Sequence, residues 1–138
     1  MPARDALPGN VLTRDARLRV VVAGIIGALA VAAGAYAVHG LGAVRDAHAV
    51  GLWQTASQYQ LMHAGVTVAA ALGGQVLHRR LAALAGWLFL LGCVLFGGAL
   101  YGLGWWGPSP LGAVAPVGGM SFILGWLLLA AAALKAPR

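Results

Sequence analysis

Long apolar segments alternate with short polar connections along the chain. Each apolar segment is about 20 to 25 residues long, which at about 1.5 Å per helical residue matches a hydrocarbon core of about 30 Å. The pattern predicts an all-α fold, an integral membrane four-helix bundle. The expected helices run over about residues 18–40, 52–77, 81–104 and 113–134.

The segments outside these helices are polar or rich in residues that end helices. Residues 1–17 mix prolines, a glycine and alternating charges, so we expect a polar N-terminal tail. Residues 18–138 then form the four-helix transmembrane domain. The connection after the third helix, 105–110, carries no charge, and its prolines stop a helix while its tryptophans favour the headgroup region.

Basic residues are distributed unequally between the two sides of the predicted membrane. Cytoplasmic loops of membrane proteins carry an excess of lysine and arginine. Of the nine basic residues, only Arg45 falls in a connection on the opposite side. Both termini are therefore expected to be cytoplasmic, in the cell (inner) membrane. The residues on the cytoplasmic side are Arg4, Arg14, Arg17, Arg19, Arg79, Arg80, Lys135 and Arg138.

Composition narrows the class of protein further. Hydrophobic residues make up 61% of the chain and charged residues 9%, whereas a soluble domain has about 25% charged residues. The net charge of +6 is accounted for by the topological anchors, so we expect membrane lipid and no nucleic acid as a partner. Cys93 is the only cysteine, so it has no partner for a disulfide and cannot form a metal site alone.

Small residues recur at helical spacing in all four segments. Such ridges let two helix backbones approach closely, which replaces the hydrophobic driving force that is missing between helices in lipid. We therefore expect tight helix packing at these glycines, and a homo-oligomer. The positions are Gly24, Gly27, Gly65, Gly98, Gly102 and Gly125.

The first half of the second segment is unusually polar for a membrane helix. At about 100° per residue, Gln60, His63 and Thr67 fall on one side, while Gln54 and Gln58 fall almost opposite. Amide and imidazole groups at hydrocarbon depth must turn toward protein or water rather than lipid. This helix is therefore expected either to be central in the bundle or to turn one polar stripe toward its own bundle and the other toward a neighbouring chain.

Two interpretations of these polar residues stay open. The first is an outward-facing polar pocket that binds or transports a small polar solute or a lipid without catalysis. The second is a structural or assembly role, in which interhelical hydrogen bonds worth roughly 0.6 to 2 kcal/mol each only specify packing. The residues expected to line the pocket are His39, Gln54, Gln58, Tyr59, Gln60, His63 and Thr67.

The motifs required for most enzymatic or metal chemistry are missing. No Asp or Glu lies in an expected span, and the chain has no G-x-S-x-G, H-E-x-x-H or Glu-x-x-His pattern. His39 and His63 differ in expected depth, so they do not predict a metal or haem site. We expect no catalytic residue, no metal and no cofactor. A redox or lipid-substrate enzyme subunit remains a third interpretation, and the identity of any small-molecule ligand is open.

Four ordered motifs resemble a known family. They cover about residues 20–134, in the same order as in the family. The motifs are Tyr36-Ala37-Val38-His39-Gly40-Leu41; Trp53-Gln54-Thr55-Ala56 with Tyr59 and His63; Gly86-Trp87-Leu88-Phe89 with Leu95-Phe96-Gly97-Gly98-Ala99-Leu100-Tyr101; and Pro116-Val117-Gly118-Gly119 with Gly125-Trp126.

In these motifs the chain resembles domain-of-unknown-function family 423, a small four-helix membrane family whose animal relatives are called transmembrane protein 256. The resemblance implies the fold and the membrane location but supplies no activity. The chain departs from the family pattern at Gly97 and Ala99, where the family usually has serines. A role that depends on those two hydroxyls is therefore in doubt in this chain.

Overall fold

The computed structural model describes residues 12–137, and within that range it is all-helical and contains no strand. Four long helical rods form the bundle, which confirms the predicted all-α membrane fold. The third rod is continuous but changes its helix type in the middle. The elements are α1 (Arg14–His39), η1 (Leu41–Ala43), α2 (Ala47–Gly73), α3 (Arg79–Gly92), η2 (Cys93–Gly97), α4 (Gly98–Trp106) and α5 (Leu111–Leu134).

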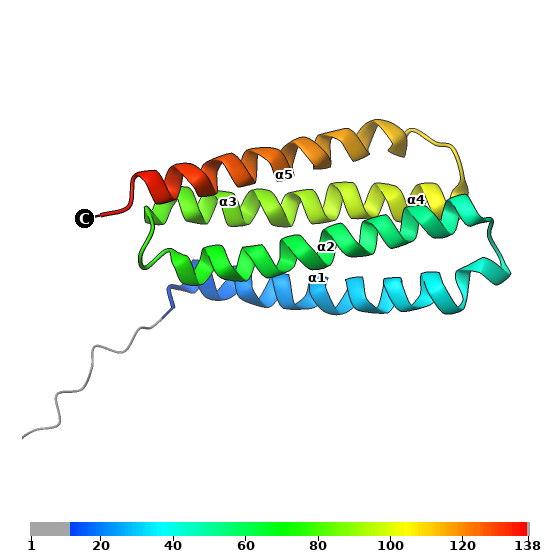
Figure 1. Cartoon of the computed structure of the whole chain (residues 1–138), viewed down its shortest axis with the longest axis horizontal. Helices are drawn as coiled ribbons and strands as arrows, with labels where there is room; N and C mark the ends of the chain where they lie inside the picture. Colours follow the sequence, from blue (N-terminus) through cyan, green and yellow to red (C-terminus); the bar gives the residue numbers. More distant parts are fainter. Residues whose placement is uncertain (1–11, 138) are drawn as a thin grey trace, which may run out of the picture.

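The rods lie side by side along the long axis of the molecule (Figure 1). The start of α1 and the end of α5 lie at the same end of the bundle, as an even number of crossings requires. Residues 1–11 and 138 are outside the described part, so most of the predicted tail, Arg4 and Arg138 are not assessed.

The third rod packs against each of the other three rods. The α2 helix packs against α1 on one side and against α3, η2 and α4 on the other, while α5 packs against the third rod and α1 touches α3. A buried apolar cluster fills the space between the rods. Its members are Ala23, Ile26, Ala64, Ala85, Phe89, Leu90, Cys93 and Phe122.

Within residues 12–137, three segments are long and apolar enough to cross a membrane: Arg14–Ala43, Arg79–Trp106 and Leu111–Leu134. The α2 helix is not among them because its first half carries the glutamines and His63. It has 27 residues, compared with 26 in α1 and 28 in the third rod, and it lies between these two (Figure 1). Helix α2 is therefore the polar member of a bundle whose other three rods are apolar.

Side-chain caps explain why α1 and α2 begin earlier than expected. The Thr13 hydroxyl accepts a hydrogen bond from the Ala16 amide at 3.1 Å, and the Asp46 carboxylate accepts one from the Ala49 amide at 2.8 Å. Each cap satisfies a backbone donor that has no partner inside the helix. The expected starts followed hydropathy alone, whereas the polar caps extend both helices into the flanking segments.

Only half of the glycines predicted to allow close packing do so. A Cβ built at Gly27, Gly102 or Gly125 meets a neighbouring side chain within 4 Å, whereas one at Gly24, Gly65 or Gly98 meets nothing within 4 Å. The last three glycines therefore make no close contact within this chain. They face outward, since the spacing of small residues does not say which side of a helix points into the bundle.

Candidate functional site

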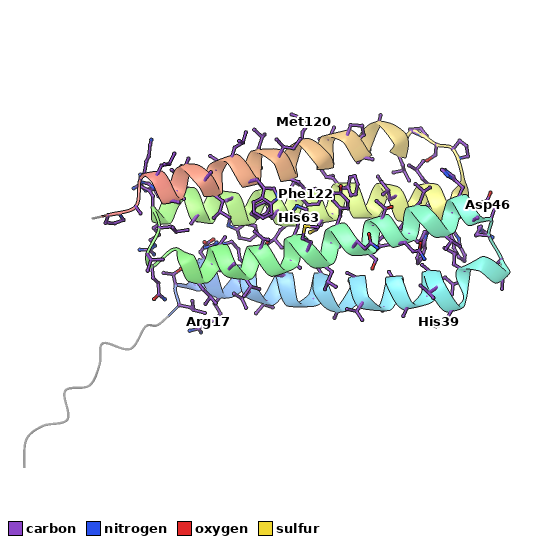
Figure 2. All side chains as sticks on the ribbon, viewed as in Figure 1. Arg17, His39, Asp46, His63, Met120 and Phe122 are labelled. Carbon is purple, nitrogen blue, oxygen red and sulfur yellow. The ribbon has the colours of Figure 1, made fainter. Side chains whose placement is uncertain are left out.

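The polar side chains of α2 reach different surroundings instead of one pocket. Gln60, His63 and Thr67 point into the bundle, but toward different partners. His39 and Gln58 are exposed, and Gln54 is half-buried. His39 is the last residue of α1, at one end of the bundle, whereas His63 lies about midway along the bundle (Figure 2). The structure thus corrects the prediction that all seven residues line one outward-facing polar pocket.

Gln60 is fixed between α2 and the third rod. Its Nε2 donates a hydrogen bond to the Cys93 carbonyl at 3.0 Å, and its Oε1 accepts one from the Tyr101 hydroxyl at 2.8 Å. The Cys93 carbonyl lies at the start of η2, a π-helical turn that is wider than an α-turn. A Cβ at Gly97 would collide with the Gln60 amide, so this glycine makes room for the side chain.

Other polar groups of α2 also pair with backbone carbonyls. The Ser57 hydroxyl donates to the Ala30 carbonyl on α1 at 2.8 Å, opposite Gly34. The Thr67 hydroxyl donates to the His63 carbonyl of its own helix at 2.8 Å. Ser57 was not among the predicted site residues. Gly34, the small residue that faces Ser57 from α1, is the only sequence feature that could have indicated this contact. No sequence pattern pairs the two residues, however.

His63 is held by both ring nitrogens. Its Nδ1 is 2.7 Å from the Tyr59 carbonyl, and its Nε2 is 3.2 Å from the Trp126 indole nitrogen on α5. A carbonyl only accepts and an indole N–H only donates, so the contacts fit a neutral imidazole with its proton on Nδ1. The ring stacks on Phe122 with centroids 3.8 Å apart and planes at 15°, and only 3% of the residue is exposed.

A groove of about 400 Å³ lies beside this histidine, between α2 and α5. Figure 2 shows His63 and Phe122 facing each other about midway along the bundle. Tyr59, Met62, Ile123 and Trp126 are substantially exposed on its sides, so the groove opens at the lateral surface of the bundle. We call it the α2–α5 groove; its lining residues are Tyr59, Met62, His63, Phe96, Gly119, Phe122, Ile123 and Trp126.

An aromatic cluster marks the end of the bundle where α4 ends. Trp53 of α2 makes edge contacts with Tyr36 and Tyr101, with ring centroids 5.5 and 4.9 Å apart. Its indole also donates to the Tyr101 carbonyl at 3.1 Å. The Arg45 guanidinium carbon lies 4.4 Å from the ring centroid of Trp105. Aromatic rings with polar tips are typical of the headgroup region of a membrane.

Metal-binding groups do not gather in the described part of the chain. Within residues 12–137, no group of three or more His, Cys, Asp or Glu side chains is placed to hold a metal ion. Cys93 is fully buried, and its thiol lies 3.7 Å from the Gln60 carbonyl. The arrangement around His63 can therefore offer hydrogen bonds and aromatic surface, but it contains no assembled metal site.

Comparison with known proteins identifies relatives that are membrane proteins. The chain is 39% identical over 118 residues to the UPF0382 membrane protein YwdK of Bacillus subtilis, covering 84% of this chain and 95% of the relative. It is 36% identical over 125 residues to the UPF0382 inner membrane protein YgdD of Escherichia coli, covering 88% and 93%. No solved structure matches.

A family profile matches as well. Residues 33–119 match the family described as Protein of unknown function (DUF423). These residues include the second helix, the third rod and the start of α5, so the match contains most of the α2–α5 groove. Together with relatives similar over nearly their whole length, this match shows that the chain is a membrane protein of the DUF423 family.

Proposed function

We propose that this protein binds a lipid or another apolar molecule, without catalysis, in the α2–α5 groove. The observation that carries the proposal is a groove of about 400 Å³ with apolar walls and an imidazole at its base, open on the side of a membrane bundle. Ligand pockets of this kind are mostly apolar with a few placed polar groups. Since Gln60, His63 and Thr67 already have hydrogen-bond partners within the chain, a lipid fits better than a polar solute.

The hydrogen bond between Trp126 and His63 is the polar contact that a ligand can exchange. Its 3.2 Å length is at the long end of the usual range of about 2.7–3.2 Å. Trp126 is 44% exposed, so its indole can swing toward the membrane while His63 keeps its bond to the Tyr59 carbonyl. A ligand hydroxyl then donates to Nε2 in place of the indole, and the ligand chain lies against Met62 and Ile123.

We also propose that the protein lies in the inner membrane with both termini on the cytoplasmic side. Arg14, Arg17, Arg79, Arg80 and Lys135 all belong to the end of the bundle where α1 begins and α5 finishes. Arg45 belongs to the aromatic end. This asymmetry follows the preference of basic residues for the cytoplasmic side. The orientation can be measured by introducing a cysteine at either end of the bundle and testing which one a membrane-impermeant thiol reagent labels in intact cells.

Filling the groove tests the binding proposal directly. Gly119 lines the groove and has nothing within 4 Å of a built Cβ, so Gly119→Leu can place its side chain in the groove from an open backbone position. Gly112→Leu is the matched control, because Gly112 lies on the same helix, is equally open and does not line the groove. The measurement is native mass spectrometry of full-length protein released from nanodiscs made of the native membrane.

We expect wild type and Gly112→Leu to retain a lipid or apolar molecule and Gly119→Leu to lose it. Equal retention by both variants would contradict binding in the groove. A quinone as the retained molecule would favour the redox interpretation of the same groove. The ligand of the groove would then be a quinone and not a structural lipid.

A structural or assembly role is the second candidate function. It is favoured by Gln60, Ser57 and Thr67, whose polar side-chain atoms bond to groups within the same chain. His63→Leu separates the two functions. A variant that folds and assembles normally but loses the retained molecule supports binding, whereas a variant that fails to assemble supports the structural role.

Self-association remains a prediction. The open faces of Gly24, Gly65 and Gly98 are compatible with contact by another copy, because nothing lies within 4 Å of a Cβ built there. The mass of the detergent-free particle in native nanodiscs measures the number of chains. A mass equal to a single chain would contradict the homo-oligomer.

A further inference from the structure

A second cavity lies at the basic end of the bundle, away from the α2–α5 groove. It has a volume of about 480 Å³ and lies between the start of α1, the end of α2 and the start of α3. We call it the basic-end cavity. Its lining includes the cations Arg14, Arg19 and Arg79, the amide side chain of Gln75 and a single carboxylate, Asp15.

Arg19 is the buried member of this cavity. Only 4% of the residue is exposed, and its guanidinium lies over Gly86 of α3. Nε and Nη2 donate to the Asp15 carboxylate at 3.1 and 2.9 Å. Nη1 has no acceptor anywhere in residues 12–137. A buried charged donor without a partner is costly, so the Arg19 guanidinium, which lines the cavity, is short of one acceptor.

Asp15 does not neutralise the whole cavity. One of its oxygens accepts from Arg19, and the other accepts from the Trp87 indole at 3.0 Å. Arg14 and Arg79 are exposed at the rim and have no salt bridge among the described residues. With three arginines against one carboxylate, the lining is net positive. Two helix ends with partial positive charge, the starts of α1 and α3, border the cavity, against one end with partial negative charge, the end of α2.

We propose that the basic-end cavity binds the phosphate of an anionic phospholipid headgroup. Arginine guanidinium groups fit phosphate oxygens with paired, charge-assisted hydrogen bonds. The cavity lies where the membrane-length segments Arg14–Ala43 and Arg79–Trp106 both begin, so its depth matches the headgroup region. Basic pockets between membrane helices are a physical match for anionic headgroups on the cytoplasmic side. Free phosphate shares this chemistry, but it would have to come from water instead of the bilayer.

The experiment compares two double variants of the full-length protein in detergent. Arg14→Gln/Arg79→Gln removes the two rim cations of the cavity. Arg17→Gln/Arg80→Gln removes two exposed cations from neighbouring positions that do not line it. Arg19 itself is left unchanged, because its buried ion pair also supports folding. Native mass spectrometry measures the affinity for phosphatidylglycerol, with phosphatidylcholine as the zwitterionic reference and inorganic phosphate as the soluble competitor.

We expect wild type to prefer phosphatidylglycerol over phosphatidylcholine. The Arg14/Arg79 variant should bind phosphatidylglycerol about 10-fold more weakly, since each lost charge-assisted contact weakens binding. The Arg17/Arg80 variant should stay within about twofold of wild type, because exposed charges outside the cavity contribute little. Inorganic phosphate should not displace the lipid, since it lacks the acyl chains that hold the headgroup at the interface.

Three results would overturn the proposal. Equal weakening in both double variants would mean that the basic end attracts lipid only by its overall charge. No preference for phosphatidylglycerol would remove the headgroup site. Displacement by inorganic phosphate at the concentration that saturates the free protein would assign the cavity to a soluble anion. None of these results bears on the α2–α5 groove, which is filled independently by Gly119→Leu.

Discussion

Adjacent glycines on α5 lie in two different kinds of helix contact. Gly118 faces the third rod, where a Cβ would lie 2.8 Å from the Phe96 Cα, whereas Gly119 lines the α2–α5 groove with nothing within 4 Å. Helix α2 shows the same division. Gln60 bonds the backbone of the third rod, while His63 meets α5 through side chains alone, stacking on Phe122 and accepting from the half-exposed Trp126.

The difference between the two contacts separates a fixed region from an adjustable one. Gly118 and the Gln60 Nε2 contact backbone atoms of the third rod, which move only when the rod itself moves. Contacts across the groove use side chains, which change rotamer without moving a helix. Substitutions at the third-rod contact should therefore cost stability, and substitutions in the groove should change binding with little cost.

Gly118→Ala should be the most destabilising change at this contact. Its new methyl group would meet the Phe96 backbone, so α5 must shift away from η2. Overpacking of this kind costs typically about 1–3 kcal/mol of the free energy of unfolding. Gly119→Ala is the control and should leave stability unchanged or raise it by up to about 1 kcal/mol, because alanine is a better helix former than glycine. Reversible unfolding in mixed detergent micelles measures both values.

Equal effects of the two alanine variants would contradict the division. They would mean that α5 packs on the third rod as loosely as it packs across the groove. Destabilisation by Gly119→Ala alone would place the close contact on the groove side instead.

Gln60→Leu should have the next largest effect. The Tyr101 hydroxyl and the Cys93 carbonyl each lose their bond to this side chain. We expect a loss of about 1–2 kcal/mol, because hydrogen bonds between membrane helices contribute roughly 0.6 kcal/mol on average and up to about 1.7. Gln58→Leu is the matched control, since Gln58 is exposed and should change stability little. The same unfolding measurement applies, and a larger loss for Gln58→Leu would contradict the assignment of Gln60 as the fixed contact.

The helices themselves followed from the sequence because hydropathy is a local property. The length and hydropathy of a segment indicate by themselves whether it lies in lipid. The all-α four-helix fold was therefore predictable without knowledge of the packing. The polar half of α2 could be placed in the bundle for the same reason. Its rotation could not be predicted, since the partners of Gln60 and His63 depend on where the third rod and α5 lie.

The details of the site depend on contacts between distant parts of the chain. The π-turn η2, from Cys93 to Gly97, contains no proline and has no pattern that predicts it. It positions the Cys93 carbonyl that receives Gln60, and Gly97 clears the space for that side chain. The predicted outward-facing pocket failed because helical angle alone placed Gln60 and His63 on one shared surface. In the bundle, Gln60 bonds the third rod and His63 bonds α5.

The contact between His63 and Trp126 should contribute less than the contacts with the third rod. A double-mutant cycle with His63→Leu and Trp126→Phe isolates the hydrogen bond between them. We expect a coupling of about 0.6 kcal/mol in the free energy of unfolding, the average for membrane helices. A coupling well above about 1.7 kcal/mol would identify a rigid contact, and the groove could then not exchange the indole for a ligand.

Gly98→Ala should have the smallest effect on the isolated chain. Gly98 is exposed on α4 and has nothing within 4 Å of a built Cβ, although Gly97 beside it is pressed against Gln60. Within one chain the substitution should be neutral or raise stability by up to about 1 kcal/mol, since a glycine becomes an alanine in a helix. If this face instead packs on a second copy, the methyl group should separate the copies. The particle in native nanodiscs would then have a lower mass, while the free energy of unfolding of the single chain stays unchanged. Measured on the same sample, mass and unfolding therefore distinguish an open face toward lipid from an interface between copies.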